Sequence, residues 1–170
     1  GNYRHVLDLL RSKTDSSTTI LEIGCYGGKW TEQMVGVQKI ICVDLFDESF
    51  EFIRNRFNDG YNLEFYRTRG DELEGVGSET VDLIFSMDSL VRAPRRAIRN
   101  YFKEMNRVLR SGGEVVVHLP CQDSPMSIGM YFTSLSRGWI ERVVTTSGFS
   151  SYSIDDATLK HGLLVLAQKD

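Results

Sequence analysis

Short apolar stretches alternate with amphipathic ones along most of the chain. The apolar stretches are rich in β-branched residues and predict strands over 19–23, 39–43, 63–66, 81–85 and 113–119. Short, nearly continuous apolar runs are typical of parallel strands that are covered on both faces. The pattern therefore indicates a buried parallel sheet.

The segments between these strands carry apolar residues at helical spacing. They predict helices over 3–10, 30–35, 49–57 and 139–144. Asp47 would cap the third of these helices. The clearest helix follows Pro94, which suits a first helical position, and its apolar face runs from Ile98 to Leu109. We expect this helix to end at the turn Ser111-Gly112-Gly113.

Alternation of strand and helix requires parallel pairing through right-handed crossovers. Two last apolar runs, 151–154 and 163–167, lie close together and predict a closing hairpin, hence one antiparallel strand. We therefore predict an α/β fold, doubly wound around a mostly parallel seven-stranded sheet, with one antiparallel strand near the C-terminus. The absence of a linker or repeat indicates a single domain over residues 1–170.

Composition narrows the range of functions. The 170 residues carry a formal net charge of −3, which argues against nucleic acid as a partner. Three cysteines without a pairing pattern indicate free thiols in a reducing compartment, so we expect a cytoplasmic protein. The three histidines show no metal-ligand spacing, so no metal is expected. No apolar run is long enough to span a membrane. The oligomeric state stays open.

A glycine-rich loop follows the first predicted strand, at the edge where open α/β sheets bind ligands. It contains Gly24, Tyr26 and Gly28, and about twenty residues after Gly24 the second strand ends at Asp44. A carboxylate at that place can accept hydrogen bonds from both hydroxyls of a ribose. The combination indicates a nucleoside-containing cofactor, but Tyr26 breaks the Gly-x-Gly-x-x-Gly pattern of dinucleotide sites.

Several motifs in series resemble class I S-adenosylmethionine-dependent methyltransferases. The similar segments, in the order the family has them, are 21–31, 41–44, 69–73, 81–86, 106–113 and 148–149. The resemblance implies S-adenosylmethionine as the cofactor and S-adenosylhomocysteine as the product. It covers nearly the whole chain and implies a Rossmann-like methyltransferase fold.

The resemblance also implies roles for individual residues. Glu22 and the glycine loop would hold the methionine moiety, Asp44 the ribose hydroxyls and Asp71 the adenine amine, while Ser86 would lie near the sulfonium. Tyr26 stands where the family usually has a glycine, a place it tolerates if its φ is negative. The expected cofactor-binding residues are Glu22, Gly24, Cys25, Tyr26, Gly28, Asp44, Leu45, Asp71, Glu72 and Ser86.

Two polar residues near the same edge are candidates for catalysis. His118 ends the fifth strand and has the right pKa range for a general base toward a hydroxyl, or it is a hydrogen-bonded strand histidine. Asp88 follows the fourth strand and would orient or deprotonate an acceptor, bind a metal with an unidentified partner, or cap a turn.

A hydroxyl loses its proton when it is methylated, and the chain lacks amino-methylation motifs. We therefore predict O-methylation of a small molecule or glycan, and a non-catalytic S-adenosylmethionine-binding module of a larger protein or complex is the alternative. Two further groups of residues have more than one interpretation. The first forms either an anion-binding face or a solvated helix face, and its residues are Arg92, Arg96, Arg99 and Lys103. The second forms a lid over the acceptor, a surface for a partner or ordinary packing, and its residues are Met126, Met130, Tyr131 and Phe132.

Overall fold

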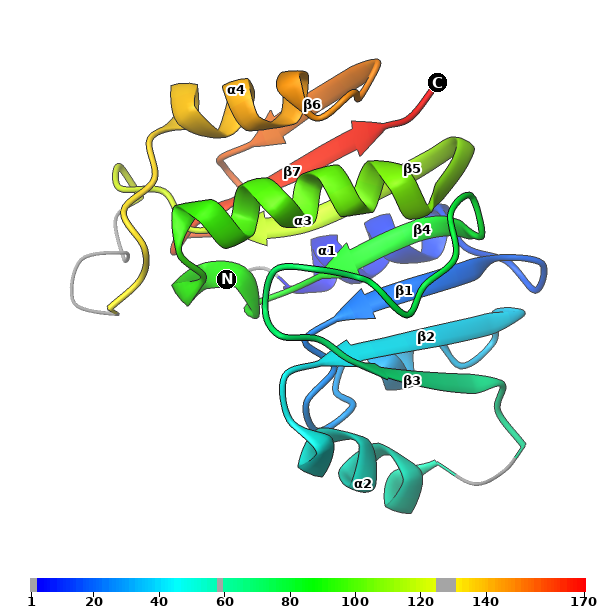
Figure 1. Ribbon diagram of the computed structural model, residues 1–170. Helices are drawn as coiled ribbons and strands as arrows, with labels where there is room; N and C mark the ends of the chain where they lie inside the picture. The colour runs from blue at the N-terminus through cyan, green and yellow to red at the C-terminus, as the bar shows by residue number, and fades with distance from the viewer. Residues whose placement is uncertain (1–2, 58–59, 125–130) are drawn as a thin grey trace.

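The computed structural model describes residues 3–57, 60–124 and 131–170. These residues form one seven-stranded sheet in the order β3-β2-β1-β4-β5-β7-β6 (Figure 1). All neighbouring strands pair in parallel except β7, which is antiparallel to both β5 and β6. The predicted fold class is confirmed. The strands are β1 (Thr19–Ile23), β2 (Lys39–Asp44), β3 (Leu63–Arg67), β4 (Val81–Ser86), β5 (Leu109–Leu119), β6 (Ser151–Asp155) and β7 (Leu163–Gln168).

Helices cover both faces of the sheet. In Figure 1, α3 and α4 lie in front of it and α1 lies behind it. The alternating side chains of the strands feed two apolar cores, one under α3 and α4 and one under α1 and α2. No helix in the described parts of the chain is long and apolar enough to cross a membrane. The helices are α1 (Tyr3–Ser12), α2 (Asp47–Arg56), α3 (Arg95–Val108) and α4 (Arg137–Thr146), with short 3-10 turns at Thr31–Met34 and Leu90–Arg92.

Three local predictions about helix ends are wrong. Asp47 is the first residue of α2 rather than its cap, and Pro94 precedes α3 with extended backbone. Helix α3 ends at Val108, before the predicted stop, because Leu109 already pairs with Val81 of β4. The strand contacts of β5 thus override the helical pattern of its first residues.

The connection from β3 to β4 contains no helix. Leu73 and Val76 fill the core in its place, and Arg107 of α3 donates hydrogen bonds to the backbone carbonyls of both residues. Glu104 accepts the backbone N–H of Leu73 and pairs with Arg107 at 2.7 Å. Helix α3 therefore fixes the loop that follows β3, and this loop forms one wall of the cavity described next.

Candidate active site

A large cavity opens at the carboxyl edge of β1, β2 and β4. Its volume is about 1190 Å³, which exceeds the ~300–1,000 Å³ of typical small-molecule sites. The loops after four strands and the first turn of α3 line it. Gly24 follows β1, Asp44 ends β2, Asp71 follows β3 and Asp88 follows β4. The cavity has room for a nucleoside cofactor and a second small ligand.

The glycine loop forms the tightest contact of this cavity. Gly24 has a φ of +81°, and a Cβ added there would lie 1.8 Å from the hydroxyl oxygen of Ser89. Only glycine allows the loops after β1 and β4 to come this close. Tyr26 has a φ of +36°, so the condition under which this position accepts a tyrosine without backbone strain is not met. Tyr26 is 70% exposed and lines the cavity together with Gly24 and Asp44.

Asp44 lies at the base of the cavity with its carboxylate fixed by the backbone. Its Oδ2 accepts the N–H of Tyr26 at 2.9 Å, and its Oδ1 accepts the N–H of Phe46 at 3.2 Å. The thiol of Cys25, which also lines the cavity beside Leu45, lies 3.8 Å from Oδ2. A carboxylate oxygen has two lone pairs, so Oδ1 can accept one more hydrogen bond, whereas the second lone pair of Oδ2 faces the weak thiol donor of Cys25. One ribose hydroxyl can thus donate to Oδ1, and a second can donate to Oδ2 when it displaces the thiol contact.

The loop after β3 forms the opposite wall. Asp71 lines the cavity and accepts a hydrogen bond from the Asn100 amide at 3.1 Å. Glu72 does not line the cavity, since its carboxylate accepts backbone N–H groups of its own loop. Thr68 and Tyr101 line this wall with their hydroxyls 3.2 Å apart. Sequence reasoning missed both, because Tyr101 reads as one more apolar residue of α3.

Three of the expected cofactor residues lie beneath the cavity rather than in its lining. The hydroxyl of Ser86 is fully buried and donates to the carbonyl of Ile23 at 3.0 Å. Gly28 packs against Phe57 on the far side of the loop. Glu22 accepts the hydroxyl of Thr31 at 2.6 Å, and burial raises its pKa to about 8. These residues support the site from below.

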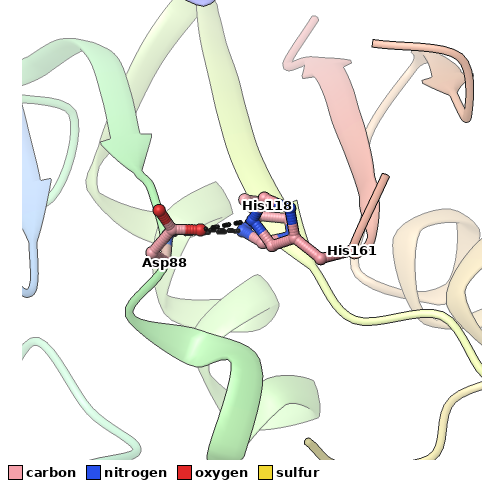
Figure 2. Close-up of side chains that lie close together, drawn as sticks. All are labelled: Asp88, His118 and His161. Atoms are coloured by element: carbon pink, nitrogen blue, oxygen red, sulfur yellow. Dashed lines mark hydrogen bonds and ion pairs between the residues drawn. The ribbon is translucent and has the colours of Figure 1, made fainter. Parts of the chain in front are cut away.

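At the other end of the cavity, Asp88 contacts side chains from three distant parts of the sequence, and Figure 2 shows two of them, His118 and His161. Its Oδ1 lies 2.8 Å from Nδ1 of His118 on β5 and 2.9 Å from Nε2 of His161, just before β7. The hydroxyl of Tyr3 on α1 donates to Oδ2 at 2.6 Å. Burial disfavours ionisation of Asp88, but the hydrogen bonds from His118, Tyr3 and His161 outweigh it and hold the pKa of the carboxyl below its ordinary value.

The two catalytic candidates therefore lie together, but they face different surroundings. The Asp88 side chain is 37% exposed and lines the cavity, whereas His118 is fully buried and does not. The Nε2 of His118 has no hydrogen-bond partner among the described residues and lies against Gly162. A direct contact between His118 and an acceptor is therefore excluded. Asp88 has a φ of +58°, which is the kind of strained backbone that gathers at functional sites.

Sequence reasoning missed His161. The histidines show no metal-ligand spacing in the sequence because the residues of the cluster, Asp88, His118 and His161, come from three separate segments. One signal was available, because an antiparallel last strand must begin at the carboxyl edge of the sheet. The pairing of His118 with Leu164 and of Leu119 with Leu163 places His161 just beyond that edge.

The structure places only some of the basic residues and of the methionine and aromatic residues whose roles the sequence left open. Arg92 and Arg96 line the cavity, whereas Arg99 stacks over the ring of Trp139 on α4, with 6.0 Å between the guanidinium and the ring centre. Met126 and Met130 lie outside the described residues, and Tyr131 is 92% exposed. Two residues of the basic face thus belong to the cavity lining, and Nη2 of Arg96 lies 3.8 Å from Oδ2 of Asp71.

Fold and site together define an α/β domain that binds a nucleoside cofactor at the carboxyl edge of its sheet. A family model described as a methyltransferase domain matches residues 20–113, more than half of the chain. The chain belongs to this methyltransferase domain family. It is an S-adenosylmethionine-dependent methyltransferase domain, and the predicted class, cofactor and enzyme type are confirmed.

Comparison with other proteins gives one similar curated sequence and many similar structures. The tRNA N(3)-methylcytidine methyltransferase trm141 of Schizosaccharomyces pombe is 28% identical over 110 residues, which cover 61% of this chain and 44% of that protein. The chain thus spans less than half the length of this relative. An S-adenosylmethionine-dependent methyltransferase from Mesorhizobium loti has a TM-score of 0.79 at 16% identity and covers 99% of this chain and 98% of its own. The PH0226 protein from Pyrococcus horikoshii OT3 has a TM-score of 0.79 at 15% identity, with coverages of 99% and 91%. At these identities the structural similarity shows the fold alone.

Proposed function

We propose that this domain transfers the methyl group of S-adenosylmethionine to a hydroxyl oxygen of a small molecule or a glycan. One observation carries the proposal. The cavity that contains Asp44 at one end extends to Asp88 at the other, where two imidazoles contact the carboxylate. The donor and an oxygen acceptor can therefore occupy the same space.

The residues at the Asp44 end suit the cofactor. Asp44 would accept hydrogen bonds from the ribose hydroxyls, and Asp71 would accept one from the adenine amine. Gly24 would let the methionine part lie against the backbone of the loop. When bound, the cofactor supplies an electrophilic methyl group, so the domain needs to supply position and electrostatics rather than a covalent residue.

The Asp88 end suits an acceptor that must lose a proton. A hydroxyl in the cavity would donate a hydrogen bond to Asp88, which orients an oxygen lone pair toward the methyl group. As the bond from this oxygen to the methyl carbon forms, the hydroxyl becomes strongly acidic, and its proton would pass along the hydrogen bond to the Asp88 carboxylate. A neutral amine needs no such help before it attacks, and for this reason we favour oxygen over nitrogen as the methylated atom.

The tRNA activity of the similar yeast enzyme suggests a second candidate, a nucleic-acid acceptor. A protein that grips nucleic acid usually carries a basic excess, whereas this chain has a net charge of −3. The presence of Arg92 and Arg96 in the cavity lining favours a smaller acceptor, one that carries an acidic or strongly polar group.

The experiment is a transfer assay with methyl-labelled S-adenosylmethionine and three acceptor panels: hydroxylated small molecules, glycans and tRNA. We expect label in methyl ethers of the first or second panel, identified by mass spectrometry of the product. Label restricted to nitrogen atoms or to tRNA would contradict the proposal. Cofactor binding without product from any panel would instead favour the non-catalytic module.

A further inference from the structure

We propose that Asp88, His118 and His161 form a binding site for one divalent transition-metal ion. The three side chains come from the loop after β4, from β5 and from the segment before β7 (Figure 2). One ligand atom of each lies within 4.8 Å of the others. Two of the three histidines in the chain meet here, although 43 positions separate them in the sequence (161 minus 118).

The spacing of the ligand atoms suits a common ion. Zinc and similar ions lie about 2.0–2.2 Å from nitrogen and oxygen ligands, so two ligand atoms of one ion lie about 3.0–3.4 Å apart. The Oδ1 of Asp88 lies 2.8 Å from Nδ1 of His118 and 2.9 Å from Nε2 of His161. The carboxylate would need to move only a few tenths of an ångström from each imidazole to admit the ion, and the ligand atoms of the two imidazoles lie within 4.8 Å of each other.

The hydrogen-bond pattern around His118 gives a second reason. The Nδ1 of His118 lies 2.8 Å from Oδ1 of Asp88 and 3.3 Å from the backbone nitrogen of the same residue. A proton on Nδ1 is donated to Oδ1 in this contact. A metal ion can take the place of that proton, because both bind the same nitrogen lone pair.

The ligand set also indicates which ions would bind. Two imidazole nitrogens and one carboxylate suit zinc, iron(II) and cobalt(II), whereas magnesium and calcium prefer oxygen ligands. Three protein ligands leave at least one position on the ion for water or substrate. Because Asp88 lines the cavity and His118 does not, that position would face the acceptor.

The role of the ion in the reaction rests on the proposed function. An acceptor hydroxyl on the ion would release its proton to solvent, since a bound cation lowers the pKa of an oxygen ligand. The oxygen lone pair would then form the bond to the methyl carbon as the carbon–sulfur bond breaks. The bonding electrons pass to sulfur, which leaves the neutral thioether S-adenosylhomocysteine. The ion itself is neither oxidised nor reduced.

The site can be tested without any acceptor. The protein is freed of metal with a chelator, dialysed and titrated with zinc by calorimetry in the presence and absence of S-adenosylmethionine. We expect one zinc ion per chain, and at least tenfold weaker binding in His161→Gln and Asp88→Asn, because each variant lacks one ligand. Thermal unfolding and S-adenosylmethionine binding of both variants show whether they are folded.

Two matched controls separate this site from other zinc ligands. His5→Gln removes the third histidine, which is exposed and outside the cluster, and Cys121→Ser removes a buried thiol close to His118 in the sequence. Both controls should keep the single zinc ion. Absence of zinc binding, or binding that folded His161→Gln and Asp88→Asn retain in full, would overturn the site.

The two proposals fail separately. If the metal-free protein methylates hydroxyl acceptors at the same rate as the zinc-loaded one, the role of the ion is wrong and the proposed function stands. If zinc binds as expected and methyl groups go only to nitrogen, the proposed function is wrong and the metal site stands.

Discussion

The two ends of the cavity hold their carboxylates in different ways. At the cofactor end, Asp44 accepts hydrogen bonds from the backbone N–H groups of Tyr26 and Phe46. At the acceptor end, the carboxylate of Asp88 is held by side chains, those of Tyr3, His118 and His161. Backbone donors do not titrate and survive most substitutions. Side-chain donors titrate, bind metals and disappear with one substitution. Under the proposed function, the first end would bind the cofactor through fixed donors, and the second would supply groups that can take up a proton or a metal ion.

The largest effect should follow from Asp88→Asn. The amide keeps the size of the side chain but loses the negative charge that faces the acceptor. We expect methyl transfer to fall by about 10²–10⁴-fold, the usual range for loss of a group that handles a proton. S-adenosylmethionine should bind as in the wild type, because the cofactor end is untouched. Turnover at saturating cofactor measures the first quantity, and calorimetry measures the second.

Substitution of Glu22, which lies beneath the cofactor end, should change how the free energy of unfolding depends on pH. Burial raises the pKa of Glu22 from 4.5 to about 8. Between these values the folded protein keeps a proton that the unfolded chain has released, so the free energy of unfolding falls as pH rises. The slope is about 1.4 kcal/mol per pH unit for one proton. In Glu22→Gln this contribution disappears.

Urea denaturation at several pH values between 5 and 8 measures the difference. The wild type should lose stability toward pH 8 relative to Glu22→Gln, whose curve should be flatter. Parallel curves for the two proteins would mean that Glu22 ionises normally, and the account of the support under the cofactor end would be wrong.

Asp44→Ala should weaken the cofactor and leave the acceptor end intact. Loss of hydrogen bonds to a charged group costs about 1.5–3 kcal/mol, equivalent to about 10- to 150-fold in affinity for S-adenosylmethionine. The control is Asp47→Ala, which removes an exposed carboxylate that pairs with Arg67 at the surface. If calorimetry gives equal affinities for the two variants, Asp44 does not bind the ribose.

The smallest effect concerns the backbone of the loop. Tyr26 has a φ of +36°, which costs an L-residue other than glycine about 1–2 kcal/mol. Tyr26→Gly relieves this cost but frees the unfolded chain, so we expect a net gain of at most about 1 kcal/mol in the free energy of unfolding. Gly27→Ala, at a neighbouring position with open space around it, serves as the comparison. A clear loss of stability in Tyr26→Gly would show that the ring contact with Phe52 outweighs the strain.

The cofactor end could be predicted from the sequence, and the acceptor end only in part. Gly24 and Asp44 are recognisable because a glycine turn and an acidic strand end follow two consecutive strands of a parallel sheet. Asp88 and His118 were found by their places at strand ends. His161 was not found, because its position depends on how β7 pairs with β5. Ser86 was assigned to the cavity, but a residue that ends a central strand can also point inward, as its bond to Ile23 shows.

We propose that the cavity holds the cofactor at Asp44 and the acceptor at a separate place, Asp88. Calorimetric titration of S-adenosylmethionine into wild type, Asp44→Ala and Asp88→Asn distinguishes the two ends. We expect weaker binding in Asp44→Ala alone, with Asp88→Asn indistinguishable from wild type. Equal affinity in all three proteins, or a loss confined to Asp88→Asn, would contradict it.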